Sequence, residues 1–194
     1  MNAYEGVSVV VSDNRGENSD PWEYTIFVCS NSPSDYPLPT SCQSTTNDDG
    51  SVDVNSGKPG PAFQTGSGFC KRLASDASTA TVAPIFGGGG SSRDSRGYAR
   101  GVLLNYTGGN QCWSPAQNVF IPRQVTLLME CHDGPIVPPG SALVLETTRC
   151  QYYISIKSRM GCPTQCLGPG GAVCGGAGVC GYDATNGMYF CFSP

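Results

Sequence analysis

Eleven cysteines among 194 residues constrain this chain more than any other feature of its sequence. Cysteines at this density form either metal sites or disulfides. No C-x-x-C pair occurs and His132 is the only histidine, so the sequence does not support a zinc site, and we expect no cofactor. The cysteines therefore indicate a disulfide framework made in an oxidising compartment, in a protein that is secreted, on the cell surface or in the secretory lumen.

Charge and composition argue against a nucleic-acid partner and against a membrane-spanning segment. The chain has 11 Lys and Arg against 15 Asp and Glu, so it lacks the basic surface that a nucleic-acid backbone requires. No apolar run approaches the length of a membrane span. The 26 glycines and 15 prolines predict many turns and little helix.

Stretches rich in β-branched and aromatic residues predict an all-β domain. Between them, residues 31–68 look like a long irregular loop, and "GGGGSSRDSRG" looks like a flexible linker. Short strands with Gly/Pro turns favour a barrel or a two-sheet sandwich. The predicted strands are residues 6–12, 22–30, 79–86, 99–109, 123–131, 141–148 and 151–158.

The sequence changes character after Pro163, which predicts a β-domain at 1–163 and a cysteine-rich segment at 164–194. The segment has almost no core-forming residues and must depend on cross-links. Its "CGGAGVC" and "MYFC" stretches resemble the first four cysteines of an EGF-like module, although Ser193 stands where such a module places its fifth cysteine. The resemblance implies the bridges Cys166–Cys180 and Cys174–Cys191.

The larger domain resembles a known family on three stretches: "LLNYTGGNQC", "RQVTLLMEC" and "ETTRCQYYISIKSRMGCP". A Tyr-x-Gly-Gly turn before a cysteine, an Arg that opens the next strand, and a Glu six residues before a Tyr are similar to the mannose 6-phosphate receptor homology family. The resemblance covers roughly residues 4 to 163. It implies a flattened β-barrel of two sheets, and several family members bind mannose-type glycans.

The resemblance points to Arg123, Glu146 and Tyr152 as carbohydrate-binding residues. The chemistry agrees, because a sugar presents vicinal hydroxyls that each donate and accept. An Arg fork, a carboxylate and a phenol hydroxyl together can read such a pattern. The alternative is a surface ion pair between Arg123 and Glu146, with Tyr152 as an ordinary strand aromatic. Trp113 either stacks on a sugar ring or packs against its neighbours.

The fourth sugar contact of the family is a glutamine, and here the sequence departs from the pattern. The best alignment places Lys71 at that position, and lysine cannot accept a hydrogen bond as an amide does. A second alignment uses Gln43 but requires a long insertion before Arg123. Some domains of the family lack a complete set and do not bind sugars.

The family also implies disulfides: Cys112–Cys150, Cys131–Cys162 and Cys29–Cys70. Cys42 is then left over, so we expect it to be unpaired or bonded to another chain. The family usually has a further cysteine upstream of "GVSVVVS", which predicts that Met1 is not the natural start.

The sequence favours binding over catalysis, since there is no G-x-S-x-G motif and no second histidine for a base relay. Two functions remain open. The first is a lectin-like domain for mannose-type, including phosphomannosyl, glycans on glycoproteins. The second is a sugar-blind module of the same fold that makes protein contacts in an extracellular assembly. Asn105 begins a glycosylation sequon, Asn105-Tyr106-Thr107, which agrees with the oxidising compartment.

Overall fold

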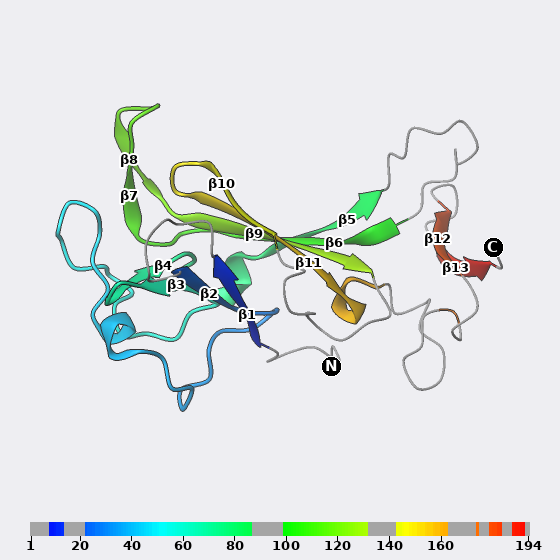
Figure 1. The fold of residues 1–194 in the computed structure, drawn as a ribbon, viewed down its shortest axis with the longest axis horizontal. Coiled ribbons are helices and arrows are strands. Elements are labelled where there is room, and N and C mark those ends of the chain that lie inside the picture. Colours follow the sequence, from blue (N-terminus) through cyan, green and yellow to red (C-terminus); the bar gives the residue numbers. More distant parts are fainter. Residues whose placement is uncertain are drawn as a thin grey trace. The chain divides into compact units, whose positions relative to one another are not determined.

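The computed structural model describes residues 8–13, 22–86, 99–131, 143–162, 174, 179–183 and 188–192. Within these ranges the regular structure consists of thirteen strands and three short 3₁₀ helices (Figure 1). This confirms a mostly β chain in several sheets, cross-linked by disulfides. None of the helices formed by these residues is long and apolar enough to span a membrane.

The chain forms two compact units. The first combines Met1–Thr81, Asn105–Thr126 and Leu143–Ile154, and the second holds the remaining residues. All the pocket residues discussed below belong to the first unit. The boundary predicted between residues 163 and 164 stays a prediction, because residues 163–170 lie outside the described ranges.

The first unit contains an antiparallel four-stranded sheet in sequence order (Figure 1). Burial alternates along β1, so that Val9 and Val11 are buried on one face of the strand. The second half of β2 is buried on both faces. The four strands are β1 (Ser8–Asp13), β2 (Trp22–Phe27), β3 (Ala62–Gly66) and β4 (Phe69–Arg72).

A tight hairpin joins β3 and β4. Gly66 pairs with Phe69, so the loop has two residues, Ser67 and Gly68, with φ of 49° and 76°. Two successive left-handed residues make a type I′ turn, whose twist matches that of the flanking strands. The expectation of an irregular loop over 31–68 is therefore wrong for 62–66, where a strand forms.

A second sheet has the order β10-β11-β9-β6-β5. Burial alternates along β9 and β11, as expected when one face of a strand is covered. The strands predicted in this part of the sequence are present, with ends that differ by a few residues. Their bounds are β5 (Thr81–Phe86), β6 (Ala99–Tyr106), β9 (Gln124–Cys131), β10 (Leu143–Thr148) and β11 (Gln151–Ser158).

Two further hairpins were not predicted as such. β7 (Gln111–Ser114) pairs with β8 (Val119–Pro122), and β12 (Val179–Asp183) pairs with β13 (Met188–Phe192). The three 3₁₀ helices are η1 (Thr40–Gln43), η2 (Ala77–Thr79) and η3 (Arg159–Gly161).

Three disulfides are those that the two resemblances imply: Cys112–Cys150, Cys131–Cys162 and Cys174–Cys191. Cys112–Cys150 ties strand β7 to the residue that precedes β11. The implied bridge from Cys166 to Cys180 cannot be compared, because Cys166 lies outside the described residues.

The fourth disulfide corrects the sequence analysis. Cys70 pairs with Cys42 and not with Cys29, so the expectation that Cys42 is left over is also wrong. Helix η1 carries Cys42 to within 5.0 Å, Cα to Cα, of Cys70 on β4, and both sulfurs join the buried cluster around Phe27 and Phe63. Cys29 instead lies beyond the end of β2 at a φ of 55°.

A buried arginine holds the loop that follows this disulfide region. The side chain of Arg72 is fully buried, lies 5.0 Å from the centre of the Phe63 ring, and pairs with Asp53. Its guanidinium donates to the carbonyls of Asn55, Lys58 and Pro59. A buried charge with this many partners stabilises one conformation of the loop, because any opening would leave the charge unpaired.

Tyr106, at the end of β6, connects to the end of β2. Its hydroxyl accepts from the Cys29 N–H at 2.9 Å and donates to the Phe27 carbonyl at 3.2 Å. Burial raises the pKa of Tyr106 to about 12, so the hydroxyl stays protonated and able to donate at neutral pH. This residue is the Tyr of the Tyr-x-Gly-Gly motif, and its role in the fold is structural.

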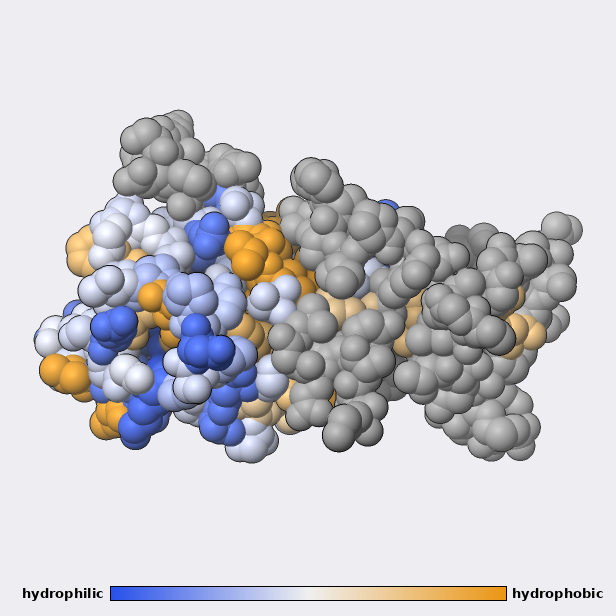
Figure 2. Space-filling view, turned by 90° about the horizontal axis from the view of Figure 1, so that it is seen from below, coloured by the Kyte–Doolittle hydropathy of each residue, from blue (hydrophilic) through white to orange (hydrophobic). Residues whose placement is uncertain are grey.

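The described surface is largely polar on the face shown in Figure 2, where hydrophobic side chains form small separate groups. The exposed large hydrophobic residues come from several different elements. They are Val10, Val52, Val54, Phe69, Val82, Val119, Phe120 and Leu143.

We predict that Tyr106→Phe destabilises the protein by about 1–3 kcal/mol, because the buried Phe27 carbonyl and the Cys29 N–H lose their hydroxyl partner while the ring packing is kept. Urea denaturation measures the free energy of unfolding. Tyr36→Phe is the matched control, since the Tyr36 hydroxyl makes no hydrogen bond with the described residues and its ring packs on Phe27. Equal stability of the two variants would contradict the role given to Tyr106.

We also predict that non-reducing peptide mapping recovers Cys42 joined to Cys70. Replacing both with alanine should cost about 3–4 kcal/mol in the chain-entropy picture, since the bridge closes a loop of 28 residues. Recovery of a Cys29–Cys70 peptide would show that the assigned pairing is wrong.

Candidate functional site

A row of side chains crosses the first sheet. The strand register places Tyr24 on β2 opposite Gln64 on β3, and Gln64 opposite Lys71 on β4. Directly opposed residues of antiparallel strands point to the same face. Gln64 donates from Nε2 to the Tyr24 hydroxyl at 2.9 Å, which fixes its amide plane. An amide and an ammonium group thus lie side by side on one face of this sheet.

The alternation of buried and exposed side chains along β9 and β11 also explains why Arg123 and Tyr152 point inward. Arg123 immediately precedes β9 and has the parity of the buried residues of that strand, while Tyr152 is the first buried residue of β11. The backbone of Arg123 is held on both sides, since its N–H donates to the Asn110 carbonyl and its own carbonyl accepts from Gly109, each at 2.9 Å. Both side chains are consequently fixed at the point where the two strands begin.

These side chains meet at a pocket of about 590 Å³, which is large enough for a small ligand. The pocket is lined mainly by polar residues from β2, β3, β4, the start of β9, β10 and β11. They are Trp22, Gln64, Lys71, Arg123, Glu146, Thr147, Thr148, Arg149 and Tyr152.

Arg123 is the most buried charged group of the pocket, with 9% of its side chain exposed. Nη1 donates to the Tyr152 hydroxyl, and Nη2 donates to Asp48 Oδ1 at 2.8 Å. Nε has no hydrogen-bond partner among the described residues. Burial raises the pKa of Tyr152 to about 12, so its hydroxyl accepts from Arg123 and keeps its own proton for another acceptor.

Asp48 contacts two of the lining cations from outside the lining itself. Its Oδ1 lies 2.8 Å from Arg123 Nη2 and 3.2 Å from Lys71 Nζ, and its Oδ2 accepts from the Trp113 N–H at 3.2 Å. Burial raises the pKa of Asp48, but Arg123, Lys71 and the Trp113 N–H lower it by more, so it lies below the ordinary value. Asp48 is therefore a carboxylate at neutral pH.

The loop that carries Asp48 is closed by its own polar contacts. Thr45 donates to Asp53 at 2.9 Å, and Asn47 donates to Ser51 at 2.9 Å. Asn47 also accepts from the Gln111 N–H at 2.8 Å, which anchors the loop to β7. These contacts, together with the bond from the Asp48 N–H to the Gln111 carbonyl at 2.9 Å, fix the position of Asp48 beside β7.

Glu146 lies near the end of β10 and is exposed on the pocket. Its Oε1 accepts from the Cys150 N–H at 2.9 Å, across the turn into β11. Cys150 is held in a left-handed conformation, φ 77°, and is bonded to Cys112. The disulfide thereby fixes the turn that orients Glu146, and Oε2 makes no hydrogen bond within the described residues.

A buried amide joins the parts that surround the pocket. Asn110, which is 1% exposed, accepts from the Arg72 N–H through Oδ1 and donates to the Thr46 carbonyl at 3.3 Å. Its backbone donates to the Arg72 carbonyl and accepts from Arg123. One residue thus connects β4, the loop of Asp48 and the start of β9.

The groups left over after these internal contacts describe the ligand that the pocket can satisfy. Gln64 Oε1 and Glu146 Oε2 remain as acceptors. The Tyr152 hydroxyl proton, one Lys71 proton and one Gln64 amide proton remain as donors. Mixed donors and acceptors in fixed positions complement hydroxyl groups, each of which both donates and accepts.

The structure brings the four predicted sugar-contact residues, Arg123, Glu146, Tyr152 and Lys71, into this one pocket. The alternative ion pair between Arg123 and Glu146 does not form, since Arg123 pairs with Asp48 and Glu146 accepts from the Cys150 N–H. Lys71 donates to the Thr46 carbonyl at 3.1 Å and to Asp48.

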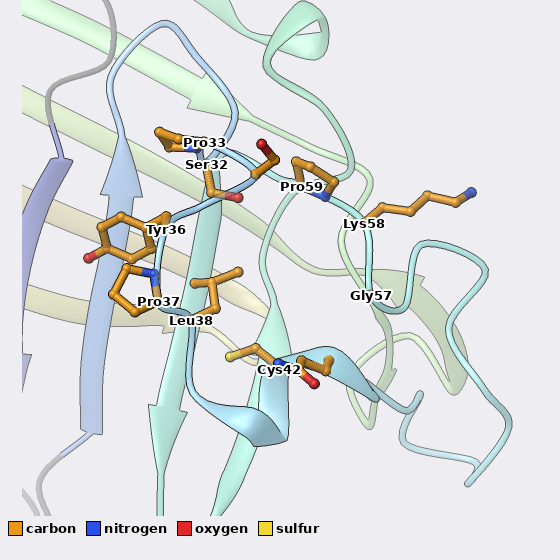
Figure 3. Close-up of a pocket in the computed structure, with 11 residues that line it drawn as sticks. Ser32, Pro33, Tyr36, Pro37, Leu38, Cys42, Gly57, Lys58 and Pro59 are labelled. Atoms are coloured by element: carbon orange, nitrogen blue, oxygen red, sulfur yellow. The ribbon is translucent and has the colours of Figure 1, made fainter.

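The other candidates lie elsewhere. Gln43 lines a second pocket of about 510 Å³, rich in proline, which also contains Tyr36 and Lys58 (Figure 3). Trp113 packs edge-on against Phe120, with 5.1 Å between ring centres, and does not line the pocket of Arg123. Asn105 is half-buried and accepts from Thr126 at 3.1 Å, while His132 lies outside the described residues.

Sequence reasoning missed Gln64 and Asp48. Gln64 could have been found from "AFQTGSGFC", where a Ser-Gly pair between two apolar stretches is a hairpin signal. The strand before that turn carries Gln64 directly opposite Lys71. The glutamine amide therefore lies on the strand next to Lys71, the residue that the sequence alignment placed at the family's glutamine position. No local pattern marks Asp48, because its contacts to Arg123 and Lys71 are formed only by tertiary structure.

Comparison with known proteins adds no family to this description. No protein-family model matches the chain, and no curated protein sequence matches it significantly.

We predict that the stabilising contribution of Asp48 depends on pH. Its folded-state pKa lies below the unfolded value of about 3.9, so the contribution is complete above that pH and is lost as the pH falls through the folded-state pKa. The difference in unfolding free energy between wild type and Asp48→Asn, measured by denaturant titration, should be constant from pH 7 to 5 and shrink below about pH 4. A difference unchanged at pH 2 would show that the ion pairs do not stabilise the fold.

Proposed function

We propose that this protein is a lectin-like binding domain of the mannose 6-phosphate receptor homology type, and that its pocket binds mannose-type glycans on glycoproteins. The observation that carries the proposal is the convergence of Gln64, Arg123, Glu146 and Tyr152 on one pocket. These are the four residue types of the family's sugar site, and the glutamine that appeared to be missing is supplied by β3.

The remaining hydrogen-bonding groups support a polyol as the ligand. Glu146 and Gln64 offer acceptors for two hydroxyl protons, and Tyr152 offers a donor. Each of these side chains is already fixed by a protein contact, which reduces the entropy lost on binding. Trp22 lines the same pocket and offers an aromatic surface for the apolar face of a sugar ring.

The rest of the proposed architecture follows the same family. The two sheets would form its flattened β-barrel, and the segment with the Cys174–Cys191 bridge would form an EGF-like module. Four disulfides among the described residues agree with a secreted, cell-surface or luminal protein. The domain acts by binding, without a chemical step.

Titration of the protein with methyl α-mannoside tests the proposal. Glu146→Gln should lower the affinity by about tenfold or more, because a charged acceptor is lost while the Cys150 N–H keeps an oxygen partner. Arg123→Lys should have a comparable effect, since lysine cannot bridge Tyr152 and Asp48 as the guanidinium does.

Glu23→Gln is the control, because Glu23 is exposed on β2 and does not line the pocket. Equal affinities of Glu146→Gln and Glu23→Gln would remove Glu146 from the site. If the folded wild type binds no glycan on an array, the lectin proposal is wrong. The alternative, a module of the same fold that makes protein contacts, would then be favoured.

A further inference from the structure

Both ends of the Arg123 guanidinium are engaged inside the protein before any ligand arrives. Nη1 donates to the Tyr152 hydroxyl and Nη2 donates to Asp48 Oδ1, and the same Asp48 oxygen also accepts from Lys71 Nζ. A single carboxylate therefore offsets Arg123 and Lys71, the two least exposed cations among the described lining residues. The Arg123–Asp48 contact is partly buried, whereas the Lys71–Asp48 contact lies at the surface, so salt screens the second more than the first.

The lining holds three cations, Lys71, Arg123 and Arg149, and one anion, Glu146. Such a lining alone would attract a phosphate or carboxylate group, since guanidinium and ammonium groups are the usual partners of these anions. Asp48, which is not a lining residue, changes that balance by pairing with Lys71 and Arg123. Arg149 is exposed at the rim, where its attraction for an anion is screened.

We propose that Asp48 determines the specificity of this pocket: by occupying Arg123 and Lys71 it makes the pocket accept a neutral polyol and reject a phosphorylated one. The sugar part of this inference rests on the proposed function. The charge part does not, because it concerns whether Lys71 and Arg123 become an anion site once Asp48 is neutralised.

The experiment compares wild type with Asp48→Asn, using methyl α-mannoside, mannose 6-phosphate and inorganic phosphate as probes in calorimetric titrations at low ionic strength. Wild type should bind methyl α-mannoside at least as tightly as mannose 6-phosphate. Asp48→Asn should shift that preference toward the phosphorylated sugar by about tenfold or more, and should gain salt-sensitive binding of inorganic phosphate.

Asp49→Asn is the matched control. It removes the same charge from the neighbouring position, but Asp49 is fully exposed and its side chain accepts from Ser51, not from Lys71 or Arg123. It should leave both the sugar preference and the phosphate binding as in wild type. An equal effect of the two variants would show that net charge alone is responsible, and would overturn the role of Asp48.

The possible outcomes separate the two proposals. If wild type binds neither sugar, the lectin proposal fails, and the inorganic phosphate titration alone decides the role of Asp48. A wild type that prefers mannose 6-phosphate, or an Asp48→Asn variant with no gain of phosphate binding, overturns the inference. If Asp48→Asn does not fold, Lys71→Gln decides: it should weaken mannose 6-phosphate further relative to the neutral sugar, and the opposite shift contradicts the proposal.

Discussion

The guanidinium of Arg123 is the group on which the candidate site depends. A charge that is this buried would be costly to leave without partners, so the chain must deliver a hydroxyl to one end and a carboxylate to the other. Tyr152 comes from a neighbouring strand of the same sheet, and Asp48 comes from a loop far away in the sequence. Satisfying one buried charge therefore fixes the relative positions of a sheet, a loop and a pocket.

Two other buried polar residues repeat this logic. Asn110 connects β4, the loop of Asp48 and the start of β9, and Arg72 holds the loop from Asp53 to Pro59 through backbone carbonyls. The first unit thus combines buried apolar side chains from several strands with polar residues that connect segments far apart in the sequence. These polar contacts and the disulfides add to the stability that the buried apolar side chains provide.

The sequence was sufficient for the strands with continuous β-branched and aromatic residues, such as β2, β9 and β11, because their propensity and alternation agree with their burial. It was insufficient for β3, which lies inside a stretch of turn-forming residues and whose pairing depends on the Ser67-Gly68 turn. The wrong disulfide, Cys29–Cys70, had a different origin, because it was implied by the family resemblance; in the structure η1 brings Cys42 to Cys70. Of the candidate-site residues, Lys71, Arg123, Glu146 and Tyr152 were predicted from the sequence. Gln64 and Asp48 were recognised only in the three-dimensional structure.

The loop from Thr45 to Asp53 is held by hydrogen bonds within itself and by contacts to Gln111 on β7, and it belongs to neither of the large sheets. Asp48, through which the loop contacts Lys71 and Arg123, does not itself lie in a strand or a helix. Under the proposed function, this arrangement makes ligand preference a modular property: substitutions or changes of length in the loop could retune the charge that the pocket tolerates while Gln64, Arg123, Glu146 and Tyr152 remain unchanged. A repertoire of related pockets could then be generated, by evolution or by an engineer, on one unaltered β framework.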